Sequence, residues 1–247
     1  MGTQGTPIPG QPERGGNQHI PRPASARAGG PPPWAHLTRE QRRFTVADMR
    51  RACSMLPSPS RAPGPTGARA AAVLAAMFDE APTPGAPVEA RVILTKRPDT
   101  MASHQGEIAF PGGKLEPEVD RDLRDAALRE AHEEIGLDPE AVEIVAELDS
   151  LVTVMGRFTL TPFVGLLGAR PALTPHLTEV DTVFDVALSE LLADATFREE
   201  RWDIGDGYGV IPGLDRAIHF FELDDETVWG ATAKILTSFL EHLTSLR

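Results

Sequence analysis

The stretch Phe110-Pro-Gly-Gly-Lys114, followed after a short acidic link by Arg129–Leu137, constrains the fold of this chain more than any other. Two adjacent glycines let the backbone turn sharply and come close to a charged ligand. The residues after them predict a helix that begins at Asp120 or Asp122, since either can cap it, and ends at Gly136, where a C-cap glycine belongs. We therefore expect a glycine turn to lie beside one face of a helix.

The predicted helix carries three glutamates on that face. Glu130, Glu133 and Glu134 are separated by the three- and four-residue intervals that bring helical side chains together. Like charges repel at this spacing, and Arg129 can pair with one of the three. Because hard cations prefer carboxylate oxygen, Mg²⁺ or Mn²⁺ can neutralise the others. The alternative interpretation is a solvated acidic helix, and the glutamate pattern by itself leaves the two evenly balanced.

Apolar runs on both sides of this helix predict a sheet. The predicted strands are Ala70–Phe78, Ala90–Thr95, Glu107–Phe110, Val142–Leu148, Leu151–Met155, Thr159–Leu167, Val180–Val186, Phe197–Trp202 and Ala217–Leu223. The alanines of the first run also fit a helix. A short helix is expected at Leu188–Leu192, and an amphipathic helix at Glu226–Leu246 closes the chain. These elements predict the α/β class, as an α/β/α sandwich around a mixed sheet.

The first 65 residues differ in composition, with 12 prolines, 8 glycines, nine arginines and three acidic residues. Such a segment buries too little apolar surface to offset its chain entropy, so residues 1–36 are predicted to be a disordered Pro/Gly/Arg-rich tail. Residues 37–64 are predicted to hold an accessory helix, Leu37–Leu56 capped by Thr38, and a linker. The folded domain is expected at residues 65–247.

Charge and composition exclude several classes of protein. The net charge is −12, and the excess of acidic residues lies after residue 65, so we expect no nucleic-acid partner. No apolar run approaches the roughly 20 residues that cross a bilayer, and the N-terminus lacks the apolar region of a signal peptide. Cys53 is the only cysteine, which fits a reducing compartment and a packing role. The predicted location is the cytoplasm, with no membrane partner.

The segment Arg129–Leu137 matches R-E-U-x-E-E-x-G-U, the second half of the Nudix box, and the chain resembles the Nudix hydrolases from about residue 65 to 245. The first half of the box differs, because Gly113 lies sixteen residues before Arg129 instead of fourteen. Asp120 or Asp122 can then replace the glutamate of that half. The resemblance implies the Nudix α/β/α sandwich around a mixed β-sheet.

A longer link of this kind is similar to that of one Nudix subgroup, the coenzyme A pyrophosphatases. The upstream signature of the subgroup is matched by Ile93–Arg97 and by Gly106 with Phe110–Gly113, and Trp229–Ala233 also looks like that subgroup. Two positions depart from the signature, since Pro98 replaces a serine and Ala102 replaces an arginine. The second change removes a bidentate phosphate donor.

The resemblance assigns roles to individual residues of the box. Glu130 and Glu134 match metal ligands, and Glu133 matches a ligand or a residue that activates water. Gly112 and Gly113 match backbone that lies near the metals and the substrate. With Arg129 added, the predicted catalytic residues inside the box are Arg129, Glu130 and Glu133.

Three residues outside the box complete the candidate site. Glu179 is a predicted additional ligand or base, with an exposed loop carboxylate as the alternative. Arg97 is predicted to contact phosphate, or else to form a surface ion pair. His104 occupies a position that often holds histidine in the subgroup, where it would touch phosphate, unless the backbone satisfies it. Trp229 is interpreted as a core residue.

The predicted function is Mg²⁺- or Mn²⁺-dependent hydrolysis of the diphosphate bond of coenzyme A or its derivatives to 3′,5′-ADP and (acyl-)4′-phosphopantetheine. Two alternatives remain open. One is a pyrophosphatase for another nucleoside diphosphate derivative, such as ADP-ribose or a dinucleotide. The other is a Nudix-fold module that binds without catalysis. The expected partner is a small-molecule nucleotide diphosphate, and a homodimer is compatible with the sequence.

Overall fold

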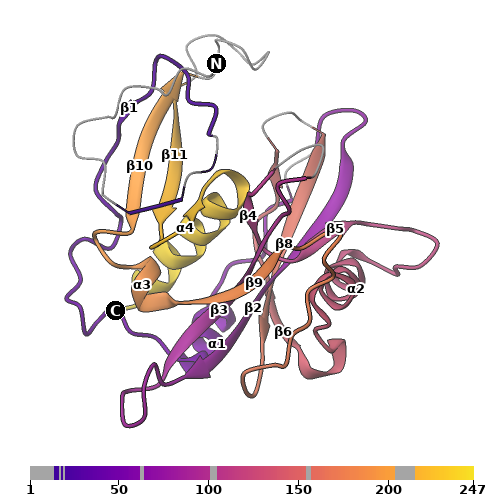
Figure 1. Ribbon diagram of the computed structural model, residues 1–247, viewed down its shortest axis with the longest axis horizontal. Coiled ribbons are helices and arrows are strands. Elements are labelled where there is room, and N and C mark those ends of the chain that lie inside the picture. The colour runs from indigo at the N-terminus through magenta and orange to yellow at the C-terminus, as the bar shows by residue number, and fades with distance from the viewer. Residues whose placement is uncertain are drawn as a thin grey trace.

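The computed structural model describes residues 14–16, 18, 20–61, 64–100, 105–153, 157–203 and 215–247 (Figure 1). The helices within these residues are α1 (Val46–Ser54), α2 (Leu123–Ile135), α3 (Leu188–Leu191), α4 (Gly230–Thr244) and the short 3-10 helix Pro139–Ala141. The strands are β1 (Arg27–Ala28), β2 (Arg69–Glu80), β3 (Glu89–Lys96), β4 (Ile108–Ala109), β5 (Gly112–Lys114), β6 (Glu143–Glu147), β7 (Leu151–Val152), β8 (Phe158–Leu166), β9 (Thr182–Ala187), β10 (Phe197–Asp203), β11 (Asp215–Glu222) and β12 (Thr227–Val228).

The larger sheet is mixed, as predicted. Its strands follow the order β4-β3-β2-β8-β6, and β5, β7 and β9 pair with β2, β8 and β3. β2 runs parallel to β8 and antiparallel to β3. Each predicted strand of this sheet has a counterpart whose described ends differ from the prediction by at most two residues. The predicted end of one strand, at Met155, lies outside the described residues.

The side chains of β2 alternate between two cores. Ala72, Leu74, Ala76 and Phe78 pack with the buried side chains of α2. Val73, Ala75 and Met77 belong instead to the core on the other face, with side chains of α1 and α4. Because consecutive strand residues point to opposite faces, this alternation places helices on both sides of the sheet. The predicted α/β/α sandwich is therefore confirmed, and the alanine-rich run is a strand.

A second sheet has four strands in the order β1-β10-β11-β12 (Figure 1). It is not hydrogen-bonded to the first sheet, but Phe197 and Phe221 share the core that covers one face of β2. Its two long strands were both predicted, and they pair antiparallel, with Phe197 opposite Phe221. The predicted closing helix is too long at its start, because Thr227–Val228 forms a strand and α4 begins at Gly230. The glycine-rich connection at 205–213 lies outside the described residues.

The segment assigned to a disordered tail contacts this second sheet where it is described. Arg27–Ala28 pairs with β10, and the Arg22 guanidinium lies 3.0 Å from the carboxylate of Glu200, which is 1 % exposed. Trp34 is fully buried and packs edge-on against Phe197 at 5.0 Å between ring centroids. Composition predicts that such a segment has no core of its own; here residues 20–36 use the core of the neighbouring sheet.

The accessory helix is shorter than predicted and has a different cap. α1 begins after Thr45, whose hydroxyl accepts from the backbone N–H of Asp48 while the Asp48 carboxylate accepts from the N–H of Thr45. Thr38 forms an exposed turn with Gln41 instead. A reciprocal capping box satisfies two free N–H groups and so decides where the helix begins.

Replacing Thr45 with alanine is expected to lower the free energy of unfolding by about 1 kcal/mol, since it removes a cap. Thr38→Ala, the matched control at the cap position that the sequence suggests, should change it by less than about 0.5 kcal/mol. Urea denaturation of both variants measures the difference. Equal losses would show that the helix begins earlier than Val46.

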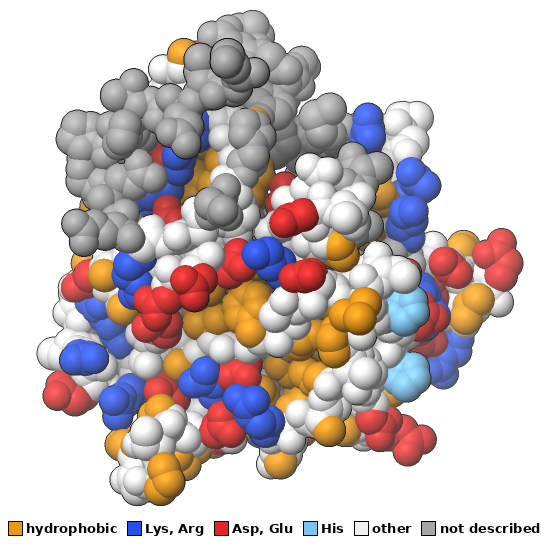
Figure 2. Space-filling model, in the orientation of Figure 1, with side chains coloured by type: hydrophobic (Ala, Val, Ile, Leu, Met, Phe, Trp, Pro, Cys, Tyr) orange, Lys and Arg blue, Asp and Glu red, His pale blue; other side chains and the backbone are white. Residues whose placement is uncertain are grey.

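Acidic and basic side chains are interspersed on the face shown in Figure 2, with hydrophobic side chains between them. The described part of this face thus carries no broad basic patch of the kind that binds phosphate backbones. In the described ranges, every helix is too short or too polar to cross a membrane.

Candidate active site

The glycine turn forms strand β5, which the sequence did not predict as a strand. Gly112 has a φ of +154°, and a Cβ there would lie 2.3 Å from the carbonyl oxygen of Ala72 and 2.6 Å from the Cα of Val73. Only glycine allows this approach. The backbone of β5 is thereby held against β2, and the N–H of Gly112 is turned toward α2, where it reaches Glu134.

Helix α2 has the predicted ends and a face of small residues. Asp122 caps its first turn by accepting from two backbone N–H groups, and Gly136 ends it in the left-handed conformation at φ +68°. Ala126, Ala127 and Ala131 are buried against the sheet. Small side chains let the helix approach β2 and β5 closely, so Glu130 and Glu134 lie directly over the glycine turn.

Glu134 is the most buried of the three glutamates, with 5 % of its surface exposed. Its carboxylate accepts a hydrogen bond of 3.0 Å from the backbone N–H of Gly112. Burial raises the pKa of Glu134 to about 7, and the nearby charges of Glu130 and Glu179 act in the same direction, against the Gly112 hydrogen bond and Arg97. The site therefore holds a carboxylate that is poorly compensated when ionised.

Glu130 lies against the second glycine. A Cβ on Gly113 would fall 2.2 Å from Glu130 Oε1, so the carboxylate occupies the space that the missing side chain leaves. Burial also raises the pKa of Glu130, with Glu133 and Glu179 adding to the rise and Arg129 opposing it. Glu133 has a different environment, because its side chain is 54 % exposed.

Arg129 anchors this group of carboxylates. Its guanidinium donates to both oxygens of Asp120 at 2.9 and 3.1 Å, to Glu133 at 2.9 Å and to Glu130 at 3.2 Å. Asp120 also accepts from the N–H of Glu116 and is 2 % exposed at its side chain. The two candidates for the missing glutamate are thus separated: Asp120 holds Arg129, whereas Asp122 caps the helix.

Two of the candidates outside the box, Glu179 and Arg97, lie near enough to Glu134 for their charges to affect its pKa. Glu179 lies in an exposed turn where its N–H donates to the carbonyl of His176, whose own N–H donates to the carbonyl of Glu134 at 2.8 Å. The charges of Glu179 and Arg97 both act on Glu134. Arg97 Nε is buried without a hydrogen-bond partner among the described residues. His104 lies outside them.

The donor set suits a hard divalent cation. Among the described residues, no three His, Cys, Asp or Glu side chains are close enough to hold a metal as they stand. Glu134 is nevertheless a buried carboxylate and Glu130 a partly buried one. Burial raises the pKa of both, and an ion such as Mg²⁺ or Mn²⁺ offers the charge that they lack. The residues present therefore fit the expected cation.

Two other residues have the packing environments that the sequence suggested. Trp229 lies at the N-terminus of α4, partly buried against Trp202 and Phe220. Cys53 is buried in the larger core, and burial raises the pKa of its thiol to about 11. A thiol with so high a pKa is protonated at neutral pH and a weak nucleophile.

Alanine substitutions at the two glycines of β5 are expected to have different effects, one on stability and the other on turnover. Gly112→Ala is expected to destabilise the fold by about 2 kcal/mol, because a methyl group there meets backbone atoms of β2 at an unfavourable φ. Gly113→Ala should cost less than about 1 kcal/mol in folding but lower turnover by at least about tenfold, since it displaces the Glu130 carboxylate. Thermal denaturation and turnover on the same samples separate the two effects; equal stabilities would contradict the close approach of β5 to β2.

The NUDIX domain family model matches residues 68–203, a span that contains the glycine turn, the carboxylate helix and Glu179. The chain belongs to the Nudix family. Its Nudix domain begins at the strand β2 and ends with β10. The second sheet and α4 therefore lie mostly beyond the region that the family shares.

Curated relatives agree with this assignment. The chain is 40 % identical over 172 residues to Nudix hydrolase 22, chloroplastic, of Arabidopsis thaliana, covering 67 % of this chain and 52 % of the relative. It is 38 % identical over 173 residues to Nudix hydrolase 15, mitochondrial, of the same plant, covering 67 % and 55 %. The Nudix hydrolase NudL of Enterobacter sp. strain 638 is 40 % identical over 148 residues, covering 59 % and 71 %. This chain spans about half the length of the two plant relatives.

Proposed function

We propose that this protein is a hydrolase that uses Mg²⁺ or Mn²⁺ to cleave the diphosphate bond of coenzyme A or its derivatives, yielding 3′,5′-ADP and (acyl-)4′-phosphopantetheine. The buried Glu134 and the partly buried Glu130, both packed against the Gly112–Gly113 backbone, are the observation that carries the reaction class. The resemblance of Ile93–Arg97 and of the longer link before Arg129 to the coenzyme A subgroup supports the substrate.

Glu130 and Glu134 would hold the cation, with Glu133 and Glu179 at the exposed side of the site. A divalent cation bound there would neutralise charge on the diphosphate and lower the pKa of the attacking water. Glu133 or Glu179, being exposed, can accept the proton of that water. Arg97, whose Nε has no partner in the described residues, would bind a diphosphate oxygen.

Arg129 has a positioning role in this proposal. It is fixed by both oxygens of Asp120 and donates to Glu130 and Glu133, so it sets where these two carboxylates point. Its charge is neutralised by these carboxylates, so this proposal assigns substrate binding to Arg97 instead.

The alternative substrate is another nucleoside diphosphate derivative, such as ADP-ribose or a dinucleotide. It is favoured by one observation: Ala102 and Pro98 replace an arginine and a serine of the coenzyme A signature. A binding module without catalysis is disfavoured, because the chain keeps all three glutamates and the arginine and aspartate that position them.

A substrate panel tests the proposal. Purified protein with Mg²⁺ is offered coenzyme A, acetyl coenzyme A, ADP-ribose, NADH and nucleoside triphosphates, and the products are separated by chromatography. We expect 3′,5′-ADP from both coenzyme A compounds. Turnover of ADP-ribose or NADH with none of coenzyme A would replace the substrate assignment, and no turnover of any compound would favour the binding module.

A further inference from the structure

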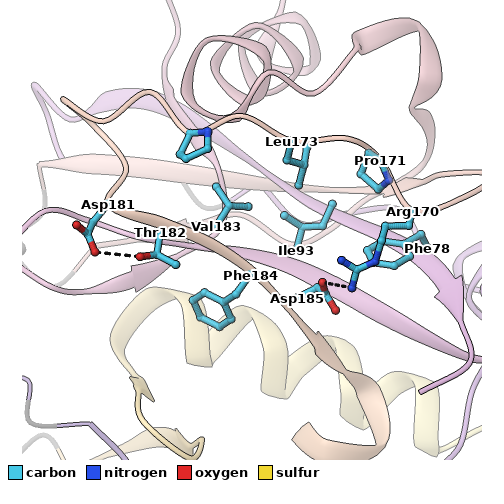
Figure 3. A pocket seen from close by; sticks show the side chains of 11 residues that line it. Phe78, Ile93, Arg170, Pro171, Leu173, Asp181, Thr182, Val183, Phe184 and Asp185 are labelled. Carbon is cyan, nitrogen blue, oxygen red and sulfur yellow. Dashed lines mark hydrogen bonds and ion pairs between the residues drawn. The ribbon is translucent and has the colours of Figure 1, made fainter. Parts of the chain in front are cut away.

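A cavity of about 370 Å³ lies on the α2 side of the larger sheet, between strands β3 and β9 and the segment 170–175 (Figure 3). Most of its lining is apolar. Ile93, Leu173 and Val183 meet in its middle, with Phe78 at one end and Phe184 below. Ligand pockets in proteins begin at about 300 Å³, so the cavity is large enough for a small organic group.

The charges around the cavity disfavour an anion. Arg170 is the one cation among the lining residues, all of which are described, and it donates to Glu80 at 2.9 and 3.0 Å and to Asp185 at 2.6 Å. Its guanidinium also lies 5.2 Å from the Phe78 ring centroid. Asp181 adds a negative charge at the opposite end. With its cation already paired, this lining repels phosphate and accepts an uncharged apolar group.

The cavity adjoins the carboxylate site through one turn of chain. Pro175 and Asp181 line the cavity, and the residues between them include Glu179, whose charge acts on Glu130 and Glu134, and His176, whose N–H donates to the carbonyl of Glu134 at 2.8 Å. The same segment is tied to the end of α2, since the N–H of Thr174 donates to the carbonyl of Ile135 at 2.9 Å. A substrate held at the glutamates could therefore extend past this turn.

We propose that this cavity binds the apolar acyl thioester end of the substrate, so that the enzyme prefers acyl derivatives over free coenzyme A. The inference rests on the proposed function. At roughly 30 Å³ for each water-sized atom, the cavity accommodates about a dozen non-hydrogen atoms. That is the size of a medium-length acyl thioester with part of the pantetheine arm. The adenosine phosphates, being anionic, stay outside it.

Leu173→Trp tests the proposal by filling the cavity. The protein is assayed with coenzyme A and with acetyl, hexanoyl and decanoyl coenzyme A, with ADP-ribose as a substrate that lacks an acyl group. The wild type should have the highest kcat/KM on the hexanoyl compound. In Leu173→Trp the ratio of hexanoyl to acetyl turnover should fall by at least about tenfold. Leu173→Ala, which enlarges the cavity, should shift the preference toward decanoyl.

Leu177→Trp is the matched control. Leu177 belongs to the same segment, is 73 % exposed and does not line the cavity, so this variant should keep the wild-type preference. If acyl length has no effect on the wild type, or if Leu173→Trp and Leu173→Ala both keep its preference, the acyl site is wrong while the coenzyme A activity stands.

Direct binding separates failure of the acyl site from failure of the proposed function. If the wild type cleaves no coenzyme A compound, the proposed function is wrong. Calorimetry with uncharged S-hexanoyl-pantetheine then measures whether the cavity still binds an apolar thioester. Binding to the wild type and to Leu177→Trp, with loss in Leu173→Trp, would support an apolar ligand site. No binding to the wild type would overturn it.

Discussion

Glu134→Gln is expected to lower the rate of diphosphate cleavage by at least about 100-fold, since even the outer partners of metal ligands contribute 10–100-fold. The glutamine amide can still accept the hydrogen bond from the N–H of Gly112, so the geometry of β5 and α2 is retained. What the variant removes is the buried negative charge that a divalent cation would neutralise. Steady-state kinetics at saturating Mg²⁺ measures the loss.

The same variant should be more stable than the wild type when no divalent cation is present. The folded-state pKa of Glu134 is about 7, above the ordinary value of 4.5, so folding takes up a proton in the window between these values. The wild type therefore loses stability as pH rises through that window. The stability gained by Glu134→Gln should grow from nearly zero at about pH 4.5 to at most about 3 kcal/mol at about pH 8.

Glu140→Gln is the control for both measurements, because Glu140 is exposed just after α2. It should keep wild-type activity and show no growing difference in stability with pH. A Glu134→Gln protein that folds and hydrolyses at the wild-type rate would show that this carboxylate has no part in catalysis. Equal stability of the variant and the wild type at every pH would contradict the burial of an uncompensated charge.

Asp120→Ala is expected to lower the free energy of unfolding by about 3 kcal/mol, because it leaves a largely buried guanidinium without its main partner. The Arg129–Asp120 pair is bidentate, with side chains 16 % and 2 % exposed. Arg129 keeps the pKa of Asp120 below its ordinary value, so the pair contributes fully at neutral pH. Its contribution is lost as pH falls below about 4. Turnover should also fall, since Glu130 and Glu133 lose a fixed counterion.

Asp122→Ala is the matched control two residues away. It removes only the N-cap of α2 and should cost about 1 kcal/mol with little loss of turnover. Urea denaturation measures the loss of stability in both variants, and steady-state kinetics measures the loss of turnover. If Asp122→Ala were the more damaging of the two, Asp122 rather than Asp120 would replace the glutamate of the Nudix box.

The sequence predicts the local geometry of the glycine turn and of helix α2 better than it predicts the outer parts of the fold, because this geometry depends on neighbouring residues. The glycine turn, the C-cap of the helix and the glutamate spacing involve neighbours in the chain, so Gly112 and Gly136 could be placed from the pattern alone, and the start of the helix was narrowed to Asp120 or Asp122. The choice between Asp120 and Asp122 depends on the position of Arg129 across the link, and only the fold shows it.

Features that depend on distant contacts were missed. The burial of Trp34 requires Phe197 and Phe221, which lie far along the chain, and composition alone cannot show such contacts. The cavity beside β9 combines β2, β3 and the segment 170–175, which lie far apart in the sequence. Its residues, such as Leu173, became candidates only through the fold.

The rate of 3′,5′-ADP release from coenzyme A, measured against free Mg²⁺ concentration for the wild type and Glu134→Gln, tests the central claim most directly. We predict that the wild-type rate rises with Mg²⁺ from a baseline near zero in chelator to saturation, whereas the variant stays near that baseline throughout. Equal rates for the two proteins, or release that is unaffected by chelator, would contradict a catalytic site built on Glu134 and a divalent cation.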